Sequence, residues 1–202
     1  MFRERLGQLI NKADDMIVAG EADNIRDALH LIQRLKPSVA IVDISLKGSN
    51  GLELLKDLRA QQIDLPVLVL SMHDESLYAE RALRAGAKGY ITKNEASAKV
   101  MGAIRQVLRG ELYLNSRFMS RLMDKVVNGR GAPIKPVDLL ADRELEVFEL
   151  VGRGLTTSEI GAQLHLGVTT VDTYKARIKE KLSLENSSRL RVEATRWVQE
   201  QE

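Results

Sequence analysis

Three polar side chains with complementary chemistry follow short apolar runs of the sequence. Asp43 and Ser71 each come directly after such a run, and Lys93 follows a third run by two residues. A carboxylate can attack a phosphoryl donor and form an acyl phosphate. A hydroxyl and an ammonium group can then bind the new phosphoryl oxygens, because positioning and charge neutralisation are most of what such a transfer requires. These residue types therefore predict a phosphoryl-accepting site.

The apolar runs alternate with segments of helical periodicity. Strands are expected at 17–19, 39–42, 67–70 and 89–91, and helices at 2–12, 25–35, 52–59, 77–84 and 96–108. This alternation indicates a parallel sheet with helices on both faces. Ligand sites collect where the carboxyl ends of such strands meet. We therefore expect Asp43, Ser71 and Lys93 to converge there, with Tyr90 inside the last strand.

The segments around these residues resemble the receiver domain of bacterial response regulators. They are VDISLKGSNG at 42–51, LSMHDE at 70–75 and AGAKGYITK at 85–93. A lone aspartate after a strand is usually a loop or cap residue, so the interpretation rests on all three segments together. The resemblance covers residues 2–114 and implies a flavodoxin-like α/β fold. It also implies that Asp43 is the phospho-acceptor, that Ser71 and Tyr90 form a switch pair, and that Lys93 binds the phosphate.

The start of the sequence departs from that family. Receivers open with an apolar strand, inside a sheet of order 2-1-3-4-5, that ends in an acidic pair holding Mg²⁺. Here Phe2–Leu6 resembles the helix after that strand, and Asp14 and Asp15 precede the next strand instead. Mg²⁺ takes one or two carboxylates beside phosphate oxygens and waters, so Asp43 alone would bind it weakly. Two interpretations stay open: a start codon assigned too late, which we favour because the acceptor, hydroxyl and lysine persist, or a receiver degenerate in phosphorylation.

The composition changes after Leu114. An apolar face at helical spacing runs over 116–126, and Asn-Gly-Arg-Gly-Ala-Pro at 128–133 is a linker signal. Beyond it only helical patterns occur, with Thr157 or Ser158 expected to cap a second helix and Thr169 or Thr170 to open a third. We therefore expect a receiver domain over 1–114, a helical linker over 115–137, and an all-α four-helix domain over 138–202.

Two of these helices, joined by a tight turn at 166–168, match a helix-turn-helix. In the third helix, Val171, Tyr174, Ile178 and Leu182 step by three and four and should face the core. Between residues 175 and 191 six basic residues stand against two acidic ones. Such a patch is an electrostatic footprint for a phosphate backbone, although a solvated helix face would carry similar charges.

Three segments of this region resemble the LuxR-type helix-turn-helix, and the likeness spans 138–198. They are residues 143–150, 154–161 and 169–182. Departures are Ala141, where a capping threonine is usual, and Gly167, where serine is usual. We predict that the third helix enters the major groove, with some residues at base edges and others at phosphates. The base-edge residues are Asp172, Thr173 and Ala176, and the phosphate-binding residues are Thr170, Lys175, Arg177 and Lys179.

Together the two resemblances imply a two-component response regulator of the NarL/FixJ-like family. Such a protein is a transcription regulator and not an enzyme, receives its phosphoryl group from a sensor histidine kinase, and binds double-stranded DNA as a homodimer. The alternative is a phosphorylation-independent DNA-binding regulator whose degenerate receiver serves for dimerisation. A small phosphatase built around Asp43 is disfavoured, because the sequence shows no second carboxylate, glycine-rich nucleotide loop or metal cluster.

Composition fits a cytoplasmic regulator. The chain has no cysteine, as is typical of a reducing compartment. Its apolar runs are far shorter than the roughly 20 residues of a membrane helix. The net charge is only +2, so a DNA-binding surface has to be a local patch.

Overall fold

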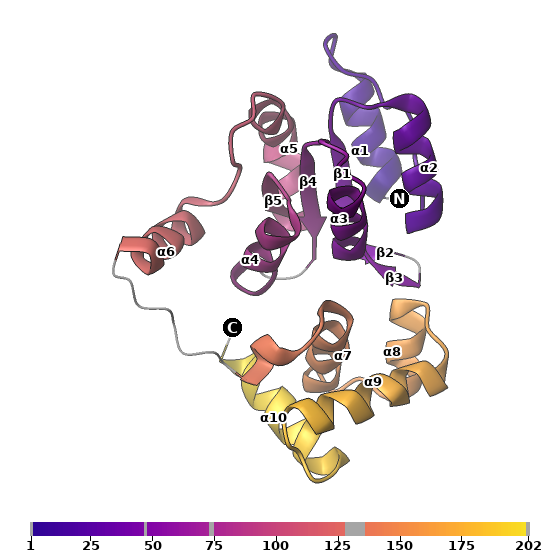
Figure 1. Cartoon of the computed structure of the whole chain (residues 1–202), viewed down its shortest axis with the longest axis vertical. Helices are drawn as coiled ribbons and strands as arrows, with labels where there is room; N and C mark the ends of the chain where they lie inside the picture. Colours follow the sequence, from indigo (N-terminus) through magenta and orange to yellow (C-terminus); the bar gives the residue numbers. More distant parts are fainter. Residues whose placement is uncertain (1, 47, 73–74, 128–135, 201–202) are drawn as a thin grey trace. The chain divides into compact units, whose positions relative to one another are not determined.

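The chain divides into two compact units in the computed structural model (Figure 1). The first holds Met1–Leu46 and Gly51–Asn128, and the second holds Lys47–Asn50 and Gly129–Glu202. The structure describes residues 2–46, 48–72, 75–127 and 136–200. The linker signal at 128–133 lies outside these ranges. Each unit has its own core.

A parallel sheet of three strands forms the centre of the first unit. Its strands are β1 (Ala40–Asp43), β4 (Val67–Ser71) and β5 (Gly89–Thr92), in the order β1-β4-β5. The register pairs Asp43 with Leu70 and Ser71 with Thr92, so the carboxyl ends of all three strands lie at one edge. Two-residue strands, β2 (Ser45–Leu46) and β3 (Ser49–Asn50), form a separate small sheet.

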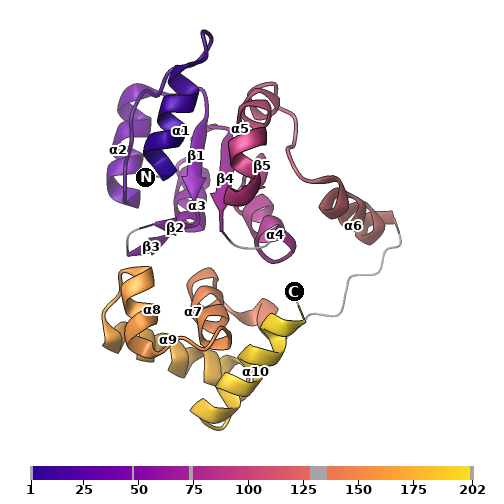
Figure 2. The same cartoon turned by 180° about the vertical axis from the view of Figure 1, so that it is seen from behind.

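Helices cover both faces of this sheet, as the alternating pattern predicts. On one face α1 and α5 pack against Leu68, Leu70 and Ile91, and Figure 2 shows this side in front. On the other face α3 packs on α4, and α4 packs on β5 (Figure 1). The helices are α1 (Phe2–Asn11), α2 (Ile25–Leu35), α3 (Gly51–Ala60), α4 (Glu75–Ala85), α5 (Lys93–Leu108) and α6 (Ser116–Val127).

The strand predicted at 17–19 is wrong, because these residues are not paired in a sheet. A strand needs a ladder partner for its backbone donors and acceptors. In a 2-1-3-4-5 sheet the second strand pairs only with the first, and no described residue supplies that strand. The Val18 amide instead donates to Asn11 Oδ1 at 2.8 Å. Val18 still packs against the core, so its apolar character has an explanation without a strand.

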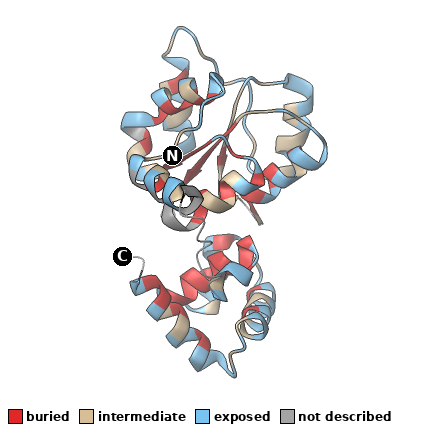
Figure 3. Ribbon diagram, turned by 60° about the vertical axis from the view of Figure 1, so that its left-hand side comes forward, coloured by how far each residue is buried: buried red, intermediate tan, exposed pale blue. Residues whose placement is uncertain are grey.

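From residue 136 to residue 200 the second unit is helical, as expected. Its elements are a 3-10 turn (Pro136–Leu139), α7 (Asp142–Gly152), α8 (Thr157–Leu164), α9 (Val168–Lys181) and α10 (Ser187–Gln199). The closest packing is between α7 and α10, where a Cβ added at Gly152 would lie 2.4 Å from the carbonyl oxygen of Ala194. Phe148 and Trp197 pack across this contact as a tilted pair, with ring centroids 5.5 Å apart and an interplanar angle of 58°. Buried and exposed residues alternate along most helices, whereas α7 is buried along its whole length (Figure 3).

Two predicted helix starts need correction. Thr156, rather than Thr157 or Ser158, caps α8, because its hydroxyl accepts from the Glu159 amide while the Glu159 carboxylate accepts from the Thr156 amide at 2.8 Å. The third helix starts at Val168 with Gly167 as its cap, ahead of the predicted threonines. Glycine tolerates a cap position without a side-chain acceptor.

Among the residues that the structure describes, no helix combines the length and the apolar character needed to cross a bilayer.

Candidate functional site

The edge where the parallel strands end brings a carboxylate and an ammonium group together. Asp43 is the last residue of β1 and Lys93 is the first of α5, and Lys93 Nζ donates to Asp43 Oδ2. The other carboxylate oxygen, Oδ1, accepts from the Ser45 amide at 3.2 Å. The Asp43 side chain is 30% exposed and that of Lys93 is 17% exposed. The pair is therefore held in place while its carboxylate stays accessible to a reactant from solution.

Ser71 lies at the same edge, on the strand next to Asp43. It is one position beyond Leu70, the register partner of Asp43, and neighbouring strands lie about 4.8 Å apart. Tyr90 lies farther from the edge, opposite Val69. Side chains alternate along a strand, so Ser71 and Tyr90 share the sheet face opposite the one that packs on α5. Both are buried. By their positions along the strands, Asp43, Ser71 and Lys93 lie at the carboxyl edge of the sheet, and Tyr90 lies farther inside.

Glycine at position 51 lets the chain turn closely behind the carboxylate. The Gly51 amide donates to the carbonyl oxygen of Ile44 at 2.6 Å. A Cβ at this position would lie 2.0 Å from the carbonyl oxygen of Asp43. Only a residue without a side chain fits there. Gly48, in the same loop, has a φ of 72°, in the left-handed region that favours glycine.

Phe2 is a contributor to this edge for which the sequence suggested no role. The Lys93 ammonium lies over the Phe2 ring, 5.7 Å from its centroid. A cation in this position is attracted by the negative face of an aromatic ring. The available signal was weak, because an aromatic residue at the start of an amphipathic helix usually serves packing.

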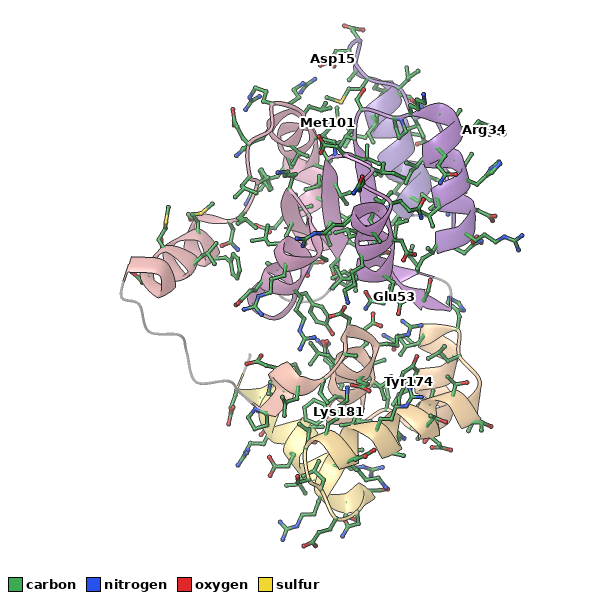
Figure 4. The ribbon with its side chains drawn as sticks, in the orientation of Figure 1. Asp15, Arg34, Glu53, Met101, Tyr174 and Lys181 are labelled. Carbon is green, nitrogen blue, oxygen red and sulfur yellow. The ribbon has the colours of Figure 1, made fainter. Side chains whose placement is uncertain are left out.

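The receiver resemblance implies a magnesium ion beside Asp43, but the residues present do not fit one. Asp43 is the sole carboxylate placed at this edge by a described contact, and its oxygens already bind Lys93 and the Ser45 amide. The described residues contain no cluster of three or more His, Cys, Asp or Glu side chains. Asp15 forms a bidentate pair with Arg105 at 3.0 and 3.1 Å. Glu53 lies in the first turn of α3, which begins shortly after Asp43, and Figure 4 shows Asp15 at the opposite end of the first unit from Glu53.

In the second unit, the surface of α9 presents the predicted DNA-contacting residues. Val171 and Ile178 are fully buried and Tyr174 is half-buried, so α9 packs through the predicted apolar stripe. On the remaining surface, side chains of the predicted set are exposed or half-buried. The exposed ones are Thr170, Asp172, Thr173, Ala176 and Arg177, and the half-buried ones are Lys175 and Lys179.

The cations of α9 differ in how far they are already engaged. Lys181 Nζ lies 2.7 Å from the Glu144 carboxylate, which also accepts from the Ala141 amide at 2.8 Å (Figure 4 labels Lys181). Lys175 donates a hydrogen bond to Thr157 Oγ1, and burial lowers its pKa. Arg177 and Lys179 form no ion pair with any residue that the structure describes. These two side chains are therefore the ones most available to an outside anion.

Comparison with known proteins agrees with both halves of this description. Residues 1–105 match the family described as response regulator receiver domain, and residues 138–197 match bacterial regulatory proteins, luxR family. The transcriptional regulatory protein DesR of Bacillus subtilis (strain 168) is 34% identical over 194 residues, covering 96% of this chain and 89% of that protein. The oxygen regulatory protein NreC of Staphylococcus carnosus (strain TM300) is 32% identical over 195 residues, covering 94% of this chain and 90% of that protein.

A solved structure shows the same fold over most of the chain. RcsB from Salmonella enterica serovar Typhimurium, bound to promoter rprA in the presence of phosphomimetic BeF3-, superposes with a TM-score of 0.57 at 22% identity. The match covers 95% of this chain and 92% of that chain. At this identity the likeness concerns the fold alone.

Proposed function

This chain belongs to the LuxR family of DNA-binding response regulators, and we propose that phosphorylation of Asp43 controls its binding to promoter DNA. One observation carries the proposal. The Asp43 carboxylate lies at the carboxyl edge of a parallel sheet, partly exposed, with the Lys93 ammonium against one oxygen and Ser71 at the end of the neighbouring strand. A nucleophile, a cation and a hydroxyl on three neighbouring segments are the groups that acyl-phosphate formation requires.

In the proposed reaction a carboxylate oxygen of Asp43 attacks the phosphorus of a phosphohistidine on a sensor histidine kinase. The new O–P bond forms as the P–N bond breaks, and the released imidazole nitrogen retains the electron pair of that bond and takes up a proton. The Lys93 ammonium offsets the negative charge of the phosphoryl group. We propose that the Ser71 hydroxyl donates to a phosphoryl oxygen, and that Tyr90 on the same sheet face moves with it.

For the DNA complex we propose that α9 occupies the major groove. Asp172, Thr173 and Ala176 would meet base edges, where an aspartate can accept a hydrogen bond from a cytosine amino group. Arg177, Lys179 and Thr170 would bind phosphates. Arg177 and Thr170 are exposed, and neither Arg177 nor Lys179 forms an ion pair with a described residue, which supports this assignment. A homodimer would place two such helices on half-sites about one helical turn apart. Because its target is chromosomal DNA, we propose that the protein acts in the cytoplasm.

A second candidate is a regulator that binds DNA without phosphorylation. The observation that favours it is the poor fit of the described carboxylates to a magnesium ion, which receivers need for phosphoryl transfer. In this case the ion pair between Asp43 and Lys93 would be structural, and the receiver would serve as a dimerisation module.

The two candidates are separated by reacting the full chain with phosphoramidate in the presence of magnesium. Phosphate-affinity electrophoresis should then show a retarded band for the wild type and none for Asp43→Asn, which removes the nucleophile while keeping the size of the side chain. Lys93→Ala should slow the labelling by at least tenfold, about 1.4 kcal/mol of transition-state stabilisation. A wild type that is never labelled would favour the second candidate.

A further inference from the structure

The hydrogen bond between Lys175 and Thr157 joins the two helices of the helix-turn-helix. Thr157 is the first residue of α8, and Lys175 lies in the second half of α9. The lysine side chain is half-buried, and burial lowers its pKa although the nearby Asp172 carboxylate acts in the opposite direction. This ammonium group is therefore engaged within the protein, in contrast to the exposed Arg177.

The bond lies far from the turn that connects the two helices. The turn itself is tightly packed, since a Cβ at Gly161 would lie 2.7 Å from the carbonyl oxygen of Leu166. Thr157 lies seven residues from Leu164, where α8 ends, and Lys175 lies seven residues from Val168, where α9 begins, which is about 10 Å of helix on each side at 1.5 Å per residue. At that distance a 10° change in the angle between the helices would move the two atoms apart by about 2 Å, more than a hydrogen bond tolerates.

We propose that this hydrogen bond is a brace that fixes the angle between α8 and α9, and that Lys175 is a positioning residue for DNA recognition rather than a phosphate ligand. The three residues proposed to meet base edges, Asp172, Thr173 and Ala176, lie within one turn of Lys175. The angle of α9 therefore decides whether all three reach the groove at once. The inference rests on the base contacts proposed above and names the interaction that aligns them.

The test uses the full chain and two fluorescein-labelled duplexes, one enriched from a random library by the wild type and one of scrambled sequence. Thr157→Val removes the hydroxyl without changing charge, and Thr157→Ser keeps it. We expect Thr157→Val to weaken binding of the enriched duplex about fivefold, with an unchanged salt dependence, and to leave the scrambled duplex nearly unaffected. Thr157→Ser should bind as the wild type does. In the Thr157→Val background, Lys175→Met should weaken binding of the enriched duplex no more than it weakens binding of the scrambled duplex, because only the effect of the lost charge is left.

Lys179→Ala is the matched control for a phosphate contact. It should weaken both duplexes alike and flatten the slope of log Kd against log salt by about one unit. The brace is refuted if Thr157→Val binds the enriched duplex as tightly as the wild type while Lys175→Met flattens the salt slope as Lys179→Ala does. If instead Lys179→Ala changes neither duplex, the proposed phosphate contact fails, and Thr157→Val still decides the brace. Circular dichroism melting ensures that each variant is folded at the temperature of the binding assay.

Discussion

Replacing Gly51 by alanine should destabilise the first unit and displace the backbone at Asp43. The added Cβ would lie 2.0 Å from the carbonyl oxygen of Asp43 and 2.9 Å from Val42 Cγ1. Because real Cβ atoms essentially never approach closer than 3.0 Å, the backbone at Asp43 has to move by about 1 Å. Gly51 does not have a positive φ, so the cost is steric and not conformational. Overpacking of this kind costs about 2–3 kcal/mol of unfolding free energy.

Urea unfolding of the full chain measures this loss in two signals. Far-ultraviolet circular dichroism reports both units, whereas the fluorescence of Trp197, the single tryptophan, reports only the second. The first signal should shift for Gly51→Ala and the second should not. Gly102→Ala is the control, because a Cβ there meets nothing within 4 Å, and alanine in mid-helix should add about 1 kcal/mol. If the unfolding free energy of Gly51→Ala lies within about 0.5 kcal/mol of the wild type, the steric reasoning is wrong.

Three further perturbations test other contacts. Glu144→Ala removes the acceptor of the Ala141 amide and the partner of Lys181. It should lower the unfolding free energy measured by tryptophan fluorescence by about 1–2 kcal/mol. An unchanged unfolding free energy would contradict a capping role of Glu144 at the start of α7. The Arg105 guanidinium holds the pKa of the Asp15 carboxyl below its usual 3.8, so this carboxylate stabilises the fold above that pH and the contribution is lost as pH falls through the lowered pKa. Arg105→Gln should raise the pKa in a carboxyl-carbon NMR titration, and an unmoved midpoint would exclude the pair in solution. Phe2→Leu should slow phosphoramidate labelling severalfold while Phe2→Tyr should not, and equal rates would remove the ring from the site.

Local patterns in the sequence predict the elements that carry the site. The apolar runs before Asp43, Ser71 and Lys93 could be predicted as strands, because each run is short and continuous and is followed by a segment of helical periodicity. The structure has a strand at each of them. The parallel arrangement follows from the alternation, and it brings the three residues to one edge without any knowledge of their contacts. The stripe through Val171 and Ile178 likewise predicts which face of α9 is buried.

Features that depend on distant partners could not be predicted in this way. The segment 17–19 has the composition of a strand, but whether it pairs depends on a neighbour elsewhere in the chain. The cap of α8 is a different case, because Thr156 and Glu159 form the local T-x-x-E pattern of a capping box, which could have identified the first of three consecutive hydroxyl residues as the cap. The cation–π contact of Phe2 and the bond from Lys175 to Thr157 join residues that no periodicity relates. Long side chains of lysine reach partners that only the folded backbone defines.

The central claim is that the state of Asp43 determines how tightly α9 binds DNA. The most direct measurement is the affinity of the full chain for its enriched duplex, by fluorescence anisotropy at fixed salt, with and without beryllofluoride as an acyl-phosphate analogue. We predict that beryllofluoride changes the affinity of the wild type by at least fivefold and leaves Asp43→Asn unchanged. Equal affinities with and without the analogue, or the same change in Asp43→Asn, would contradict the claim.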